Sequence, residues 1–310
     1  MNSINKHGFL LITALLLTGL LSSCLKENFD DCPRPFRLFI KAIDAEQNDI
    51  TASGEVHRVI LFVFNEKQQI VDAVELNASQ VKSREPVNIL LNYPGHESLT
   101  FIAWGNVDEN VEFPKTTSVK ALSDLYVRLR SASAGGRTRG ALAQSPCDLF
   151  HGTLNVPVEY GGLESAGDQT IVISRKTLQV TISAYSLKMW NENKEGAYTF
   201  ELRESNDSYD KEGNLSGDMV GYQPASTMDA DGNLFTPIFH AFPTNEKKSY
   251  TLYILFNDEV IYTADKGSDG VSFVSGVGRL LNIIIDFRAG ISIKSVVTPW
   301  NVVYQYVEYQ

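Results

Sequence analysis

Residues 56–64 read VHRVILFVF, and the six positions from Val59 onward are all apolar. A strand with one face in water alternates apolar and polar residues, whereas this run is apolar on both faces. It therefore predicts a strand covered on both sides, in the middle of a β-sandwich. Residues 36–42 (FRLFIKA) alternate with a period of two instead, which indicates a half-buried strand.

The rest of the chain repeats these patterns and contains little that predicts helix. Sixteen Phe and thirteen Tyr against four Met suit strands better than helices. One helix is predicted near 118–129, where Ser118 can cap it and Leu122, Leu125 and Leu129 form an apolar stripe. The predicted fold class is all-β with little helix, with further strands at 70–76, 87–91, 99–104, 178–183, 250–256, 282–287, 291–297 and 302–309.

Gly and small polar residues fill positions 160–168 (YGGLESAGD), which is the composition of a linker or an exposed hairpin. We therefore expect a domain boundary between 165 and 166. The regular strand spacing predicts one β-sandwich in an N-terminal domain, 35–165, and another in a C-terminal domain, 166–310.

The first residues have the features of an export signal. Lys6 precedes an uncharged run, 8–21, that is too short to span a bilayer, and Leu21-Ser22-Ser23-Cys24 resembles a lipobox. We expect a signal peptide over 1–23, acylation of Cys24 and a tether over 24–34. A plain signal peptide with a coincidental cysteine is the alternative. Acylation predicts a protein held to a membrane by lipid. The acidic residues behind Cys24, in 25–31 (LKENFDD), resemble a signal for export to the cell surface, so we expect the outer membrane and the cell exterior.

Charge and cysteine content narrow the class further. The formal net charge is −10, which argues against nucleic acid as a partner. With Cys24 acylated, Cys32 and Cys147 remain as an even pair in an oxidising compartment. They are expected either to form a disulfide or to stay as two buried free thiols.

Motifs for catalysis or cofactor binding are scarce. The chain has neither a phosphate-binding loop nor a G-x-S-x-G motif, and its histidines lack metal-ligand spacing. Residues 229–233 (DADGN) resemble the start of a calcium loop, but no glutamate closes it, so a turn between strands is expected. We predict no enzymatic activity, no cofactor, no metal and no small-molecule substrate.

Several short stretches, in a fixed order behind the lipobox, resemble the FimB-type fimbrial anchor family of Bacteroidales. They cover nearly the whole mature chain: Cys24, 31–33 (DCP), 59–64 (VILFVF), 103–106 (AWGN), 148–152 (DLFHG) and 299–300 (PW). The resemblance implies two tandem transthyretin-like β-sandwich domains. It also implies a lipid-anchored structural subunit that attaches a fimbrium, or pilus, to the outer membrane and limits its length. The implied partners are stalk or accessory subunits; a base, accessory or tip position stays open.

Subunits of such fimbriae join by inserting a strand of one subunit into the next. The C-terminal run 302–310 (VVYQYVEYQ) can serve as such a donor or can be the last strand of its own sandwich. The residues expected to carry the donor role are Val302, Val303, Tyr304, Val307 and Tyr309. The resemblance also implies that an anchor keeps its N-terminal strand, so no cleavage is expected after Arg34 or Arg37.

The alternative function is a surface glycan-binding lipoprotein of a nutrient-uptake system. Exposed aromatic platforms would favour it, with Trp190 and Tyr209 as the candidates. A secreted hydrolase is disfavoured because no catalytic motif is present.

Overall fold

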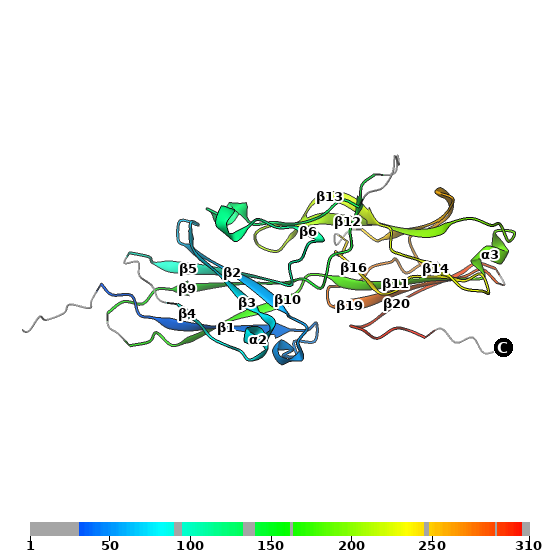
Figure 1. Ribbon diagram of the computed structural model, residues 1–310. Coiled ribbons are helices and arrows are strands. Elements are labelled where there is room, and N and C mark those ends of the chain that lie inside the picture. The colour runs from blue at the N-terminus through cyan, green and yellow to red at the C-terminus, as the bar shows by residue number, and fades with distance from the viewer. Residues whose placement is uncertain are drawn as a thin grey trace, which may run out of the picture.

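The computed structural model describes residues 31–89, 95–132, 140–161, 164–244, 248–288 and 290–305 (Figure 1). The described chain is nearly all β, as predicted, and its two α-helices, α2 (Ala78–Lys82) and α3 (Leu187–Trp190), are short. Figure 1 shows an elongated molecule with two lobes. The signal segment and Cys24 lie outside the described residues. Among the described residues, no helix is long and apolar enough to cross a membrane.

One seven-stranded sheet forms the N-terminal sandwich by folding back on itself. Only two residue pairs join β9 to β10, so the sheet turns a corner there, and its inner faces enclose a core that includes Leu38, Leu61 and Ile171. The strand order is β3-β2-β5-β9-β10-β1-β4. The bounds are β1 Phe36–Ile43, β2 Arg58–Asn65, β3 Ile70–Asn77, β4 Val87–Ile89, β5 Ser98–Gly105, β9 Phe150–Pro157 and β10 Asp168–Arg175.

Two sheets form the C-terminal sandwich. One has the order β14-β15-β11-β19-β20 with β16 beside β11. The other has the order β18-β17-β12-β13-β8, with β7 paired to β12 and β6 paired to β7. Val180 and Ile283 from the first sheet and Phe200 and Leu252 from the second share one buried core. The bounds are β6 Val111–Glu112, β7 Val127–Leu129, β8 Leu142–Ala143, β11 Leu178–Tyr185, β12 Tyr198–Tyr209, β13 Leu215–Tyr222, β14 Thr227–Met228, β15 Leu234–Phe235, β16 Phe239–Ala241, β17 Thr251–Phe256, β18 Glu259–Ala264, β19 Arg279–Asp286 and β20 Ser292–Pro299.

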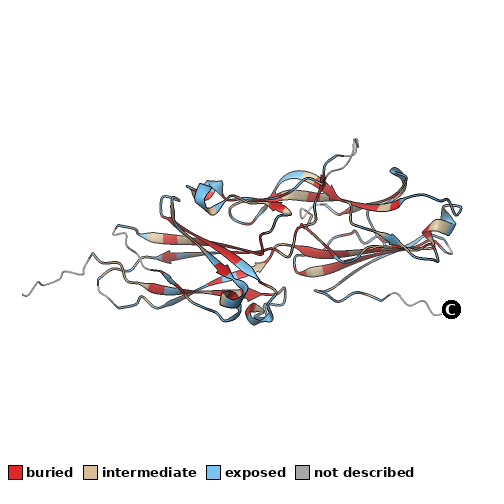
Figure 2. Ribbon diagram, viewed as in Figure 1, coloured by how far each residue is buried: buried red, intermediate tan, exposed pale blue. Residues whose placement is uncertain are grey.

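Strand β2, which contains the VILFVF run, is buried on both faces, as predicted (Figure 2). Its side chains alternate between two cores. One set (Val59, Leu61, Val63) faces the interior of the N-terminal sandwich. The other set (Ile60, Phe62, Phe64) joins the core of the C-terminal sandwich through the segment 107–129 that covers it. The uninterrupted apolar run thus records a strand between two packed layers.

The prediction of a helix near 118–129 is wrong. The segment forms two 3-10 turns, Thr116–Ser118 and Leu122–Asp124, and then β7. Leu122, Leu125 and Leu129 are all buried, but in an irregular cover over β2 and β5. Their spacing reflects contact with one apolar surface, which tertiary packing can supply without a helix.

The sheets do not respect the expected boundary at 165/166. Strand β10, which follows that position, pairs with β1 and β9 in the N-terminal sheet. Strands β6, β7 and β8, which precede it, belong to the C-terminal sheet through β12 and β13. The Gly-rich stretch is therefore a connection within the N-terminal sandwich. The N-terminal lobe contains a strand from after position 165, and the C-terminal lobe contains strands from before it.

Of the two alternatives for Cys32 and Cys147, a disulfide or two free thiols, the structure has two free thiols, both partly buried. Cys32 accepts a backbone hydrogen bond from Gly161 beyond the end of β9, whereas Cys147 lies before its start, beside Asn106. An eight-residue strand spans about 25 Å, far more than a disulfide can bridge. Burial raises the pKa of the Cys147 thiol, which makes it unreactive.

Candidate functional site

The C-terminal segment leaves the sheet at the junction between the two lobes. β20 ends at Pro299, and the chain turns back there: the Val302 N–H donates to the Pro299 carbonyl at 3.1 Å, and Asn301 has φ +61°. Residues 302–305 do not form the predicted strand. Among the described residues, β20 is the last strand of the sandwich, and it occupies the sheet edge beside β19. Val307 and Tyr309 lie outside the described residues.

Side chains of the sheet, rather than a backbone ladder, hold the described part of this segment. Gln179 accepts from the Asn301 N–H at 2.9 Å and donates to the Asn301 side chain at 2.7 Å. The Tyr304 N–H donates to Asn282 Oδ1 at 3.1 Å, and Lys294 Nζ donates to the Tyr304 hydroxyl at 2.8 Å. The Thr298 hydroxyl also donates to the Val302 carbonyl. These contacts hold the segment in place, and no backbone ladder joins residues 302–305 to a neighbouring strand.

An open groove follows the segment along the outer face of its own sheet. The groove has a volume of about 580 Å³ and is lined by β11 and β19, by 235–238 and by Val303, Tyr304 and Gln305. Val302 and Val303 are 51% and 50% exposed, and Ile238 is 38% exposed. The C-terminal end therefore offers apolar side chains beside a groove. Of the predicted donor residues, Val302, Val303 and Tyr304 lie in the described part of the chain, beside this groove.

Trp300 fixes the turn that starts the segment. Its indole ring stacks on the His240 ring, with centroids 5.4 Å apart and planes 6° from parallel. The guanidinium of Arg175 lies over the same indole ring, 4.3 Å from its centroid. Because Arg175 ends β10 in the N-terminal sheet, the turn is attached to both lobes.

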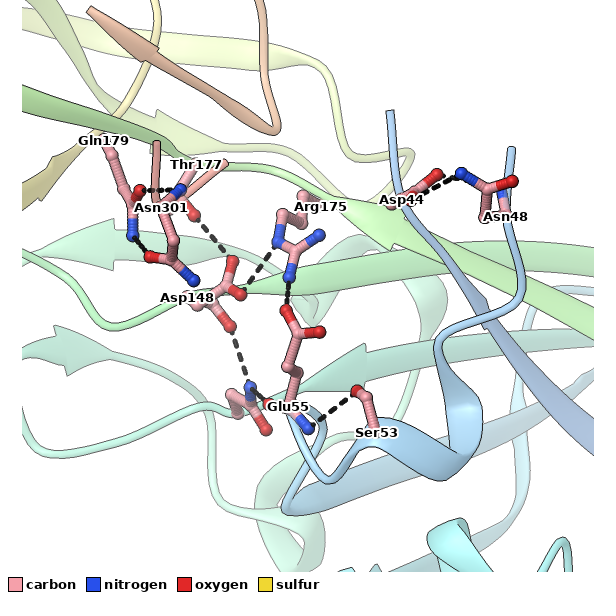
Figure 3. A network of polar contacts seen from close by, with 10 residues as sticks. Asp44, Asn48, Ser53, Glu55, Asp148, Arg175, Thr177, Gln179 and Asn301 are labelled. Atoms are coloured by element: carbon pink, nitrogen blue, oxygen red, sulfur yellow. Dashed lines mark hydrogen bonds and ion pairs between the residues drawn. The ribbon is translucent and has the colours of Figure 1, made fainter. Parts of the chain in front are cut away.

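Arg175 is the centre of a buried polar network at the junction (Figure 3). Its Nε donates to Asp148 at 2.9 Å, and its terminal nitrogen contacts Glu55. Thr177 donates to the other Asp148 oxygen at 3.1 Å. Burial raises the pKa of Asp148 to about 6, although the charge of Arg175 opposes the shift. The network joins a loop before β2, the segment before β9 and the end of β10.

Asn106 connects two of the segments that form this network. Its side-chain amide donates to the carbonyls of Glu55 at 2.8 Å and Asp148 at 2.9 Å, while its Oδ1 accepts from the His57 N–H. Its φ is +58°, a conformation that asparagine tolerates well. Next to it, the Trp104 ring packs 4.5 Å from the ring of His151.

Three of the stretches that carry the family resemblance therefore meet at one place. These are 103–106 (AWGN), 148–152 (DLFHG) and 299–300 (PW), which are far apart in the sequence. Sequence reasoning missed Arg175, Gln179 and Asn282, because a polar residue in a strand usually faces solvent, and it missed Glu55, because a glutamate in a loop usually does too. A lone arginine after the apolar residues of β10 gives no local signal of burial.

Of the two residues considered for a glycan platform, only Trp190 reaches the surface. Tyr209 is only 2% exposed and donates its hydroxyl hydrogen to the Lys176 carbonyl. Trp190 is 37% exposed, but its ring packs 4.7 Å from that of Phe287. The 229–233 loop is a turn, as expected, in which Asp229 Oδ1 accepts from the N–H groups of Asp231 and Asn233. Over the described ranges, no group of three or more His, Cys, Asp or Glu is arranged to hold a metal.

Comparison with known proteins shows the family of this chain. Residues 29–306 match the model of the fimbrillin-A associated anchor proteins Mfa1 and Mfa2. The chain belongs to this family. It is 37% identical, over the full length of both chains, to the major fimbrium anchoring subunit FimB of two Porphyromonas gingivalis strains. The crystal structure of the fimbrial anchor protein Mfa2 from Porphyromonas gingivalis has the same fold, with a TM-score of 0.60, 16% identity, and coverage of 87% of this chain and 98% of that one.

Proposed function

We propose that this protein is the anchoring subunit of a fimbrium, tied to the outer membrane through a lipid on Cys24. One observation supports this most directly: residues 31–34, the described end of the tether, lie at one end of the molecule, and residues 301–305 run toward the other (Figure 1). Pro33 pairs with Tyr160 at the outer end of the N-terminal sandwich, whereas Trp300 sits at the junction and 301–305 run along the C-terminal lobe. An anchor requires this separation of membrane and fibre attachments.

The N-terminal strand supports an anchor rather than a stalk subunit. β1 lies between β10 and β4 in the sheet, and its inward side chains Phe36, Leu38, Ile40 and Ala42 are buried. Losing the strand would open the core, and cleavage after Arg34 or Arg37 would also separate the lipid from the fold. The lipid attachment is useful only if this strand stays.

The C-terminal segment is the proposed site of attachment to the next subunit. Its described part carries exposed valines and is held by a few side-chain contacts, so release costs no ladder of backbone hydrogen bonds. An extended segment of alternating apolar residues suits insertion into the sheet of a partner that lacks a strand. In this proposal the anchor stops fibre growth at the cell surface and so limits fibre length.

Truncation after Val302 tests the attachment role. This chain keeps Trp300 and Asn301 at the junction and loses the remaining segment, so we expect a folded, lipidated protein. Cells carrying it should release fimbriae into the medium. Retention of full-length fimbriae by a folded, membrane-bound truncated chain would show that the segment is not the attachment site.

Two cysteine substitutions test the lipid. Cys24→Ala should lose acyl labelling and leave the membrane fraction, while Cys32→Ser, the matched control, should remain there. If Cys24→Ala stays in the outer membrane as firmly as the control, the lipid assignment is wrong. If cells carrying Cys24→Ala and cells carrying Cys32→Ser both keep their fimbriae, and both purified variants bind glycans on an array, the nutrient-uptake alternative replaces this proposal.

A further inference from the structure

Strands β1 and β10 form a parallel pair that connects the two ends of the molecule. Seven residue pairs join them, from Arg37 opposite Asp168 to Ile43 opposite Ser174. β1 begins at the tether end, whereas β10 ends at the junction and passes through only Lys176 and Thr177 into β11 of the C-terminal lobe. A pull on the tether therefore acts on the start of β1, and a pull on the C-terminal lobe acts on the end of β10.

Opposite pulls on these two ends would slide one strand along the other. In a parallel pair the hydrogen bonds are evenly spaced, so under sliding they all resist at once. If both strands were pulled from the same end, the bonds would instead open one at a time. We propose that the β1–β10 ladder is a mechanical clamp that keeps the chain folded under tension along its long axis. The direction of that tension rests on the proposed anchoring role.

Side chains strengthen the ladder against sliding. Arg37 binds Asp168 with two hydrogen bonds, 2.8 Å from Nε to Oδ1 and 2.7 Å from the terminal nitrogen to Oδ2, at the end nearest the tether. On the inner face, Leu38, Ile40, Ile171 and Ile173 are buried in one core. A shift by one residue would move every inward side chain of β1 to the outer face. Sliding therefore has to break the ladder and the core together.

The backbone of β1 shows which residues bond to β10. The Ala42 N–H donates to Thr51 Oγ1 at 2.9 Å, and its carbonyl accepts from the Ile50 N–H, so Ala42 faces away from β10. Backbone groups alternate along a strand, which directs those of Lys41 toward β10. A proline at 41 would remove one hydrogen bond of the ladder without changing an inward side chain.

Single-molecule pulling on the full chain tests the clamp in two directions. In a Cys24→Ala, Cys147→Ser background, Cys32 is a native attachment point at the tether end; serine can keep the hydrogen bond from Cys147 to the Asn106 carbonyl. In one protein, Glu195→Cys adds a second attachment point beyond α3, where the side chain is 86% exposed. Pulling between Cys32 and this position slides β10 along β1. A second cysteine at Glu164, just before β10, gives opening from one end. We expect a several-fold higher unfolding force for sliding, and equal forces would overturn the clamp.

A matched pair of variants separates mechanical from thermodynamic stability. Lys41→Pro should lower the unfolding force in the sliding geometry, whereas Leu76→Ala, which removes a buried side chain from the same core on β3, should lower stability in denaturant but leave that force nearly unchanged. A drop in force that follows the loss of stability in both variants would contradict the proposal. If Lys41→Pro fails to fold, the two pulling geometries still decide. These forces are properties of the chain alone. The clamp can therefore be disproved while the anchoring role stands, and the anchoring role can be disproved while the clamp stands.

Discussion

The guanidinium of Arg175 lies 4.3 Å from the centre of the Trp300 ring. This contact joins the last residue of β10, in the N-terminal sheet, to the turn that starts the C-terminal segment. Arg175 also binds Asp148 and Glu55, so this contact ties the segment to three separate parts of the chain. The position of the segment therefore depends on the junction as well as on its own sheet.

Replacing Trp300 should loosen the C-terminal segment. Trp300→Ala removes the ring that contacts Arg175 and His240, and a partly buried cation–π contact contributes roughly 1 kcal/mol. We expect faster hydrogen exchange at the Asn301 and Tyr304 amides, measured by mass spectrometry, with the fold retained. Trp190→Ala, at the far end of the C-terminal lobe, is the control and should leave both amides unchanged. Unaltered exchange in Trp300→Ala would mean that the turn does not hold the segment.

The N-terminus of the protein in working fimbriae should be Cys24. Arg37 is paired with Asp168, and β1 has a strand on each side. An arginine-specific protease therefore needs local unfolding to reach the peptide bond after Arg37. Terminal sequencing of the protein from intact fimbriae measures the start. A start after Arg34 or Arg37 would assign the chain to the stalk. Denatured protein, which should be cut at both arginines, is the control for the protease.

Asp148 should make stability depend on pH. Burial raises its folded pKa to about 6, above the ordinary value of 3.8, so the folded state binds its proton at a higher pH than the unfolded state does. Its contribution to stability therefore increases as pH falls from about 7 to 4, by an amount on the order of 2 kcal/mol. Asp148→Asn should remove this dependence, and urea unfolding of both proteins across that range measures it.

His151 acts in the opposite direction over the same range. Burial lowers its folded pKa to about 4, from 6.5, so the stability that its neutral form contributes is lost as pH falls between these values. Wild type alone can therefore show a flat profile. The difference between wild type and Asp148→Asn isolates Asp148, because His151 is present in both. A difference that is constant from pH 8 to 5 would contradict the shifted pKa.

The sequence predicts the parts of this fold that local patterns determine. The VILFVF run predicts a strand covered on both sides, and the structure confirms it, because alternate residues enter two cores. The predicted helix fails because three leucines at helical spacing can also cover a flat sheet. The boundary fails because parallel pairing of β10 with β1 joins segments far apart in the sequence. Sequence reasoning missed Arg175 for the same reason, since its partners come from three other segments.

Gly152, in the DLFHG stretch, should be the least replaceable glycine of the N-terminal sandwich. A Cβ built there lies 2.1 Å from the backbone oxygen of Val172 on β10, and backbone cannot move aside as a flexible side chain can. The close approach belongs to the β9–β10 corner, where two residue pairs turn the sheet.

We expect Gly152→Ala to destabilise the protein by about 3 kcal/mol, the upper part of the range for overpacking. Gly276→Ala is the matched control, because its Cβ would meet no atom within 4 Å, and it should change stability by less than ~0.5 kcal/mol. Chemical denaturation of both variants beside wild type measures the difference. Equal midpoints for the two variants would show that the corner can widen, and that its tight geometry does not fix the path of β10 toward the junction.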